Sequence, residues 1–138
     1  MNDAYKNIVE RRSIKNFNGQ KVSHELLEKI VEAGQCSASG MNKQSYAFVV
    51  VENEELVSTL SKLNMDIDPF YGAKSLILVF ADSNVPTYIY DGSLAMANLM
   101  NAANALGVDS CWIHRAKEMF ETEQGKKLMK EWGLPESY

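Results

Sequence analysis

The segment from Asp91 to Leu106 constrains the fold more than any other part of the sequence. Ten of its sixteen residues are Leu, Met or Ala, and it contains no Lys, Arg or Glu. Such a composition favours an α-helix, and a helix without a charged face is expected to be buried nearly all round. The segment is too short and too rich in Asn to span a bilayer, which needs roughly 20 mainly apolar residues. We therefore predict a central core helix or a helix at a subunit interface.

The remaining composition is typical of one water-soluble globular domain. The 138 residues are 46% hydrophobic and 23% charged, and no repeat or linker divides them, so we predict a single domain over residues 1–138. A net charge of -4 argues against nucleic acid or an anionic membrane as the main partner, because both are bound through clustered cations. Two cysteines without CxxC spacing or a secretory leader favour a reduced, cytoplasmic protein.

Periodicity and capping residues predict helices that outnumber the strands. Helices are expected at residues 3–12, at 25–33 with Ser23 as N-cap and Gly34 as the stop, after Asn53, at 91–106 and at 117–132. Apolar runs predict strands covered on both faces at residues 46–51 and 75–81, and more weakly at 108–113. Strands and helices do not alternate strictly, which indicates an α+β layer fold.

A basic cluster, Arg11-Arg12-Ser13-Ile14-Lys15, follows the first predicted helix, and residues 1–21 carry a net charge of +3 against -7 for the rest. Guanidinium groups match phosphate oxygens two at a time, and Ser13 adds a neutral donor, so one phosphate monoester would suit the cluster. The alternative is that these cations remain solvated and complement the dipole at the helix C-terminus.

A second polar cluster, Ser37 to Gln44, lies between the second predicted helix and the first strand. Its hydroxyls and carboxamides suit a ring edge that presents both donors and acceptors, but the segment can equally be a turn-rich connector. A weaker feature is the predicted strand 108–113, which ends at His114 and Arg115.

The sequence offers little support for other chemistries. The GxGxxG and GxxxxGK[ST] motifs are missing, so we predict no Rossmann dinucleotide site and no P-loop. HExxH is also missing and the two histidines lie ninety residues apart, so we predict no metal site. A nucleophile and base pair of Cys36 and His114 stays open, although an inert, small hydrophobic role is commoner for such a cysteine.

As a whole, the sequence resembles the small FMN-dependent nitroreductase family over essentially all of its length. The resemblance rests on motifs in the family's order: Arg11-Arg12-Ser13-Ile14-Lys15-x-Phe17, Ser39-Gly40-Met41-Asn42-x-Gln44, Phe70-Tyr71-Gly72-Ala73, the Ala-rich helix, and Gly107-Val108-x-Ser110-Cys111-Trp112-Ile113. It implies a homodimeric α+β fold with a central, mostly antiparallel sheet flanked by helices. It also implies NADH or NADPH as electron donor and nitroaromatic, quinone or related small acceptors, reduced by ping-pong hydride transfer.

The resemblance also implies which residues hold the cofactor. Arg11, Arg12, Ser13 and Lys15 match the motif at the FMN phosphate and ribityl end, and the loop of Ser39, Asn42 and Gln44 matches one that lines the flavin, often from the partner subunit. The strand end of Trp112, Ile113 and His114 matches the backbone near flavin N5. Because the chemistry belongs to the flavin, no catalytic side chain is expected.

The chain departs from the family pattern at two places. Ala38 and Ser45 stand where the family usually has Pro, and Tyr46 often corresponds to Trp. Family members also continue past a segment like residues 133–138 into another strand and a tail. The chain is therefore expected to be either truncated, which we favour because a missing strand would leave an exposed edge, or a natural short form with a compromised sheet and a weaker phosphate site. Two other functions stay open: a flavin-binding protein for storage or sensing without turnover, and a helical partner-binding module.

Overall fold

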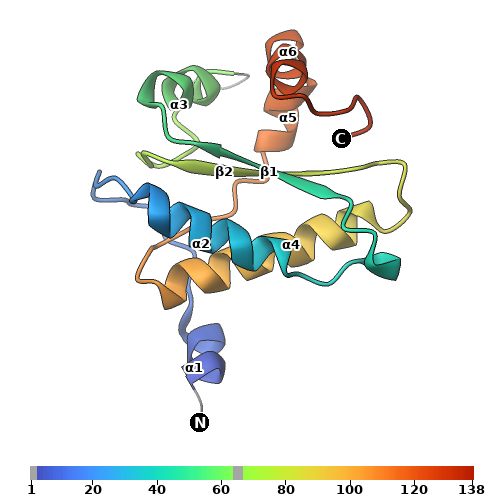
Figure 1. Ribbon diagram of the computed structural model, residues 1–138. Coiled ribbons are helices and arrows are strands. Elements are labelled where there is room, and N and C mark those ends of the chain that lie inside the picture. The colour runs from blue at the N-terminus through green and yellow to red at the C-terminus, as the bar shows by residue number, and fades with distance from the viewer. Residues whose placement is uncertain (1–2, 64–66) are drawn as a thin grey trace.

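Two strands form the middle layer of the protein, with helices on both faces. The computed structural model describes residues 3–63 and 67–138. Strands β1 (Tyr46–Val51) and β2 (Leu76–Ala81) lie between α2 (His24–Gln35) and α4 (Tyr88–Ala105) on one face and α3 (Glu54–Ser61), α5 (Ala116–Glu121) and α6 (Glu123–Glu131) on the other (Figure 1). This is the predicted α+β arrangement.

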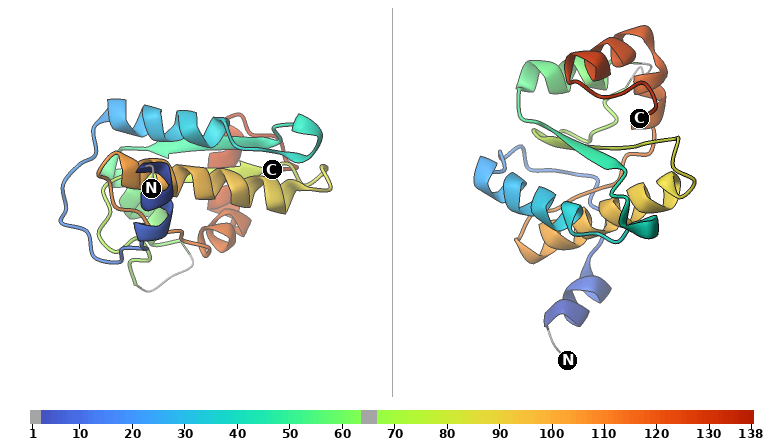
Figure 2. Two further views of the ribbon diagram at one scale, coloured as in Figure 1. Left: turned by 90° about the horizontal axis from the view of Figure 1, so that it is seen from below. Right: turned by 45° about the vertical axis from the view of Figure 1, so that its right-hand side comes forward.

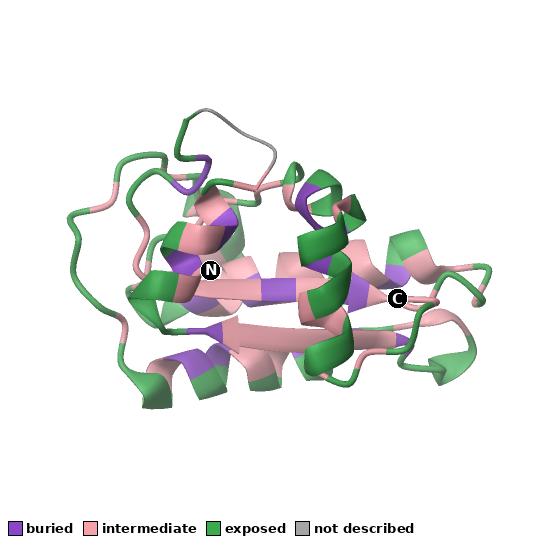
Figure 3. Cartoon of the chain, turned by 90° about the horizontal axis from the view of Figure 1, so that it is seen from above, coloured by how far each residue is buried: buried purple, intermediate pink, exposed green. Residues whose placement is uncertain are grey.

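The strands pair in antiparallel register, from Tyr46 opposite Ala81 to Val51 opposite Leu76. Side chains alternate between the faces of β2, as strand geometry requires. Ile77 and Val79 pack with the cluster of α2 and α4, whereas Leu78 and Phe80 belong to the larger core that includes α3 and α5. Most strand residues are half-buried, with Val51, Leu78 and Phe80 buried, and most other buried residues lie on the helices (Figure 3). The prediction of strands covered on both faces is confirmed.

Local signals located several helix ends correctly. The Ser23 hydroxyl accepts a hydrogen bond from Leu26 N at 3.3 Å, and Asn53 Oδ1 accepts one from Leu56 N at 2.9 Å, so both predicted N-caps are present. Gly34, predicted as a helix stop, instead lies inside α2. A Cβ on Gly34 would come within 2.7 Å of Leu99 Cδ2, so this glycine lets α2 pack closely on α4.

The predicted strand at residues 108–113 is wrong. The segment forms only one isolated parallel bridge, between Ser110 and Ser13, and no ladder. A strand needs a neighbouring strand to accept and donate its hydrogen bonds, and a cavity separates this segment from β2. Among residues 3–63 and 67–138, therefore, β1 and β2 are the whole sheet.

Two helix predictions also require correction. The expected helix at 117–132 is two helices, because Thr122 is extended (φ -73°, ψ 157°) and its hydroxyl accepts from Gly125 N at 3.0 Å as the N-cap of α6. The Ala-rich helix begins at Tyr88 and is not buried all round. Ile89, Tyr90 and Leu94 are 61%, 71% and 48% exposed, so one apolar stripe of α4 faces outward.

Helix α1 (Asp3–Glu10) protrudes from the α2 and α4 side of the molecule (Figure 2). It ends two residues before the predicted limit at Arg12 and buries no residue, and its apolar side chains Ile8 and Val9 remain 60% and 46% exposed. Side-chain amides attach it to α4: Asn7 Nδ2 donates to Asn101 O at 2.8 Å, and Asn104 Nδ2 donates to Asn7 Oδ1 at 2.6 Å.

Candidate functional site

The basic cluster lies beside the segment that carries Trp112. After α1 the chain is extended, and Ile14 N donates to Ser110 O at 3.0 Å, next to the Ser13–Ser110 bridge. This contact brings together two sequence features nearly one hundred residues apart. Arg11, Ser13 and Lys15 therefore share one region with the start of the segment from Ser110 to His114.

The two arginines of this cluster have different environments. Arg12 Nη1 donates to Val9 O and to Arg11 O, each at 2.8 Å, as expected for a cation at a helix C-terminus. Arg11 is half-buried, and its Nη1 atom is buried without a hydrogen-bond partner in the described part of the chain. A buried guanidinium nitrogen without an acceptor is costly, so Arg11 is the better candidate for an anion ligand.

Lys15 connects the cluster to the loop that follows Pro69. Its Nζ lies 5.9 Å from the centre of the Tyr71 ring, within the range of a cation–π contact. Asp68 orders this loop by accepting from Phe70 N and Gly72 N, each at 2.9 Å. Tyr71 has a φ of 54°, a left-handed conformation that is rare for an aromatic residue.

The second cluster forms a tight loop around a short 3₁₀ turn, η1 (Gly40–Asn42). Asn42 N donates to Ser39 O at 3.0 Å, and Gln44 N donates to the Ser39 hydroxyl at 2.9 Å, so Ser39 braces the loop from within. Met41, Asn42 and Gln44 all have φ between 50° and 54°. Such backbone strain is concentrated at functional sites, and the Asn42 and Gln44 side chains are exposed to a ligand.

Asp91 of α4 lies directly behind this loop, and our sequence reasoning did not identify it as a site residue. The carboxylate is 2% exposed and accepts from Gly40 N, Thr87 Oγ1 and Ser45 Oγ at 2.9, 2.8 and 3.2 Å. The Gly40 N–H lowers the pKa of Asp91 below its usual value; burial raises it, and the two hydroxyls lower it further. The available signal was that Asp91 is the one charged residue of the segment 91–106.

The two clusters lie toward opposite ends of α4 within one chain. Gly40 contacts Asp91 near the N-terminus of the helix, and Asn7 of α1 contacts Asn104 near its C-terminus. At 1.5 Å per residue these contacts are separated by about 20 Å along the helix axis. A single chain therefore does not bring the basic cluster and the Ser39–Gln44 loop together.

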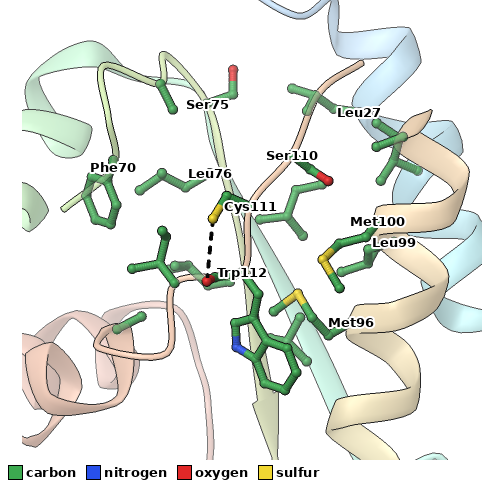
Figure 4. Close-up of a pocket in the computed structure, with 18 of the residues that line it drawn as sticks. Leu27, Phe70, Ser75, Leu76, Met96, Leu99, Met100, Ser110, Cys111 and Trp112 are labelled. Atoms are coloured by element: carbon green, nitrogen blue, oxygen red, sulfur yellow. Dashed lines mark hydrogen bonds between the residues drawn. The ribbon is translucent and has the colours of Figure 1, made fainter. Parts of the chain in front are cut away.

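A cavity of about 1220 Å³ extends along β2 on the side away from β1. All six β2 residues line it, as do Met96 and Met100 of α4 and the segment with Cys111 and Trp112 (Figure 4). Trp112 and His114 are exposed, whereas Ile113 is half-buried against the larger core. The sequence-predicted strand-end residues thus lie at the rim of the cavity rather than on a strand.

The alternative nucleophile and base pair is not assembled. Cys36 is exposed at the C-terminus of α2, so it does not pack as a small hydrophobic residue. His114 lies shortly before α5, the helix that is on the opposite face of the sheet from α2 (Figure 1). Within residues 3–63 and 67–138 no group of three His, Cys, Asp or Glu side chains is placed to hold a metal ion. None of the described helices is both long enough and apolar enough to cross a membrane.

Solved structures share this architecture. A nitroreductase with bound FMN from Bacteroides fragilis matches with a TM-score of 0.90 and 23% identity over 99% of this chain and 83% of that chain. A nitroreductase with bound FMN from Desulfitobacterium hafniense matches with a TM-score of 0.87 and 28% identity over 100% of this chain and 84% of that chain. The protein therefore has the nitroreductase-like α+β fold.

Sequence comparisons agree with the fold. A protein of Archaeoglobus fulgidus named "Putative NADH dehydrogenase/NAD(P)H nitroreductase" is 31% identical over 99% of this chain and 80% of its own length. A protein of the same name from Methanothermobacter thermautotrophicus is 29% identical over 80% of this chain and 60% of its own length. The sequence model of the Nitroreductase family matches residues 8–83. The ordered motifs, the fold and this match show that the chain belongs to the nitroreductase family.

Proposed function

We propose that this protein is a single-domain, FMN-dependent oxidoreductase that uses NADH or NADPH to reduce nitroaromatic, quinone or related small acceptors. Family membership supports this function, as do the FMN-bound structural neighbours. The observation in this chain that carries the proposal is the buried Arg11 Nη1 atom that lacks an acceptor. Phosphate oxygens are strong acceptors for a guanidinium group, which can bind two of them at a time.

Two kinds of unusual geometry coincide with the proposed site. In the described part of the chain, the buried side-chain polar atoms without a partner are Arg11 Nη1 and Ser37 Oγ, one in each polar cluster. Among residues 3–63 and 67–138, the non-glycine residues with positive φ lie in the two loops named by the resemblance: Met41, Asn42, Gln44 and Tyr71. Unsatisfied polar atoms and strained backbone are retained where binding compensates for them. The residues present therefore fit a phosphate-bearing aromatic cofactor.

Each cluster has a distinct role in this proposal. Arg11 binds the FMN phosphate with Ser13 as a neutral donor, while Arg12 and Lys15 add positive charge at the phosphate and ribityl end. Ser39, Asn42 and Gln44 hold the polar edge of the ring through hydroxyl and amide groups. Main-chain groups at Trp112, Ile113 and His114 border the ring. No side chain is proposed as nucleophile or general base.

A homodimer would complete the site. The loop contacts α4 at Asp91, whereas α1, which precedes the basic cluster, contacts it at Asn104, about 20 Å further along the helix axis, so the two do not form one site within a chain. A twofold axis places the same surface of each copy against the other, so the loop of one chain can approach the cluster of its partner. The exposed apolar side chains that such an interface would bury occur on α1 and α4: Ile8, Val9, Ile89, Tyr90 and Leu94.

FMN, when bound, supplies two-electron hydride chemistry between the nicotinamide and the acceptor. The chain itself binds the phosphate, orients the ring and excludes water from it. The cations of the basic cluster also favour a negatively charged cofactor by Coulomb attraction in a partly buried setting. An alternative is a flavin-binding protein without turnover, which the same binding residues would support.

Anaerobic spectroscopy distinguishes these functions. The purified protein, supplied with FMN and freed of excess cofactor, should retain flavin absorption bands that disappear on addition of NADH or NADPH and return with a quinone. Retained flavin that neither nicotinamide bleaches would favour storage or sensing. A chain that retains no flavin would contradict both functions.

A further inference from the structure

Asp91 is a buried carboxylate whose charge has no cationic partner. Its side chain is 2% exposed, and no Lys, Arg or His of the described residues forms an ion pair with it. A buried charge is costly unless hydrogen bonds satisfy it, and here one amide and two hydroxyls do so. Replacement by an apolar residue would remove that cost, so the contacts made by Asp91 require an explanation beyond core packing.

Two of these contacts come from the Ser39–Gln44 loop and its end, and the third comes from the residue before α4. Gly40 N donates from within the loop, Ser45 Oγ from the residue after it, and Thr87 Oγ1 from the residue before α4. The Thr87 hydroxyl does not cap α4 and instead donates its hydrogen bond to Asp91. The Asp91 carboxylate thus connects α4 to the Ser39–Gln44 loop.

The loop requires such an anchor because its backbone is strained. Met41, Asn42 and Gln44 hold left-handed conformations that cost free energy and persist only where surrounding contacts impose them. Gly40 also packs so closely on Thr87 that a Cβ at position 40 would clash with the threonine side chain. The Gly40 N–H and the Thr87 hydroxyl therefore meet the same carboxylate at the point of closest approach.

We propose that Asp91 is a positioning residue, which holds the Ser39–Gln44 loop in its flavin-binding conformation. The proposal rests on the proposed function, since it assumes that this loop contacts FMN. Asp91 does not itself touch the flavin, because its carboxylate is buried behind the loop. It acts through the Gly40 amide and fixes the backbone from which Asn42 and Gln44 project.

The chemistry of the three donors predicts a graded series of variants. Asp91→Ala removes every acceptor. Asp91→Asn keeps a carboxamide oxygen for the Gly40 amide, and the Ser45 and Thr87 hydroxyls can turn to accept from the new NH₂ group. Thr87→Val removes one hydroxyl with little change of shape. Asn98→Ala is the matched control, because Asn98 Nδ2 donates from the same helix to Ala33 O at 3.1 Å in α2 and makes no contact with the loop.

The experiment measures FMN dissociation constants by fluorescence titration and backbone amide exchange over residues 38–45 without cofactor. Asp91→Ala should weaken FMN binding by about tenfold or more and accelerate exchange in the loop. Asp91→Asn should stay within about threefold of the parent, and Thr87→Val should fall between the two. Asn98→Ala should lower the melting temperature without changing either loop exchange or FMN affinity.

The outcomes separate this inference from the proposed function. If the parent chain binds FMN and Asp91→Ala binds it equally well, the positioning role is wrong although the function stands. Equal losses in Asp91→Ala and Asn98→Ala would also overturn it, because they would indicate a general loss of stability. If the parent chain does not bind FMN, the proposed function fails. Independently of FMN, amide exchange in the Ser39–Gln44 loop that Asp91→Ala leaves unchanged would show that Asp91 does not hold the loop. Should Asp91→Ala not fold, Thr87→Val decides by the same measurements.

Discussion

Asn104 of α4 donates a hydrogen bond of 2.6 Å to Asn7 Oδ1 of α1 and so attaches the helix that precedes Arg11 to the core. The same Asn7 side chain donates to Asn101 O at 2.8 Å. Since α1 buries no side chain, these amide contacts help to hold it against α4. The position of the basic cluster therefore depends on them.

Asn104→Ala should loosen α1 and weaken FMN binding. Loss of the side-chain donor is expected to cost about 1 kcal/mol, the usual contribution of one hydrogen bond. Thermal melts and FMN titration measure the two effects. The control is Asn101→Ala. This substitution keeps the backbone carbonyl to which Asn7 donates, so the contact with α1 should be retained. Equal behaviour of the two variants would contradict this role of Asn104.

Arg11→Ala should weaken FMN binding by about 1.5 to 3 kcal/mol, the range for hydrogen bonds to charged groups. Arg12→Ala should weaken it less, because Arg12 Nη1 already donates to the carbonyls of Val9 and Arg11. Isothermal titration of both variants measures the difference. An unchanged affinity in Arg11→Ala would show that its buried guanidinium nitrogen is not a phosphate ligand.

Two helical glycines should respond in opposite directions to alanine. Gly34→Ala would place a Cβ 2.7 Å from Leu99 Cδ2 and should destabilise the fold by about 1 to 3 kcal/mol, as overpacking does. The nearest atom to a Cβ at Gly92 is Ala81 Cβ at an ordinary 3.5 Å, so Gly92→Ala should stabilise α4 by about 0.5 to 1 kcal/mol. Urea unfolding of both variants tests the contrast, and a stabilised Gly34→Ala would refute the close approach of α2 and α4.

The stability of the protein should depend on the protonation of His24. His24 Nδ1 lies 2.7 Å from Glu52 Oε2, and this hydrogen bond is the largest cause that raises the pKa of His24 above 6.5, with the charges of Glu52 and Glu28 next. A raised pKa means that the folded state binds the proton more tightly than the unfolded state. The stabilisation is therefore complete below about pH 6.5 and is lost as the pH rises through the raised pKa.

Melting temperatures of the parent chain and His24→Gln measure this effect. The parent should be the more stable of the two near pH 6, and the difference should shrink near pH 9 and in high salt, because the groups are exposed. Lys29→Gln is the control, since it removes an exposed ion pair of the same helix, with Glu25, in which no histidine takes part. A difference for His24→Gln that is independent of pH would contradict the assignment.

The sequence predicted those parts of the fold that depend on local chemistry. Ser23 and Asn53 cap helices because a hydroxyl or carboxamide satisfies the nearest backbone amides. The two apolar runs at β1 and β2 became strands because each has the other as its partner. The segment 108–113, in which the strand signal is weaker, lacks a strand beside it, so propensity alone did not decide its structure.

The candidate site was predictable in its residues but not in its geometry. The sequence indicated both polar clusters, yet only the structure distinguishes Arg11, with its unpartnered nitrogen, from Arg12, which caps α1. Asp91 was missed because an acidic residue near a helix N-terminus has an ordinary explanation in the helix dipole. Its contact with Gly40 spans 51 positions and follows from the packing of α4 rather than from any local pattern.

In the proposed dimer, Arg11 and the Ser39–Gln44 loop of one site come from two copies of the chain. Complementation tests it directly: Arg11→Ala is mixed and refolded with a loop variant, Asn42→Ala combined with Gln44→Ala, each unable to retain FMN alone. Random pairing should then restore FMN retention to about a quarter of the parent's sites, because only mixed dimers contain one intact site. A mixture that retains no more FMN than the separate variants would contradict the claim.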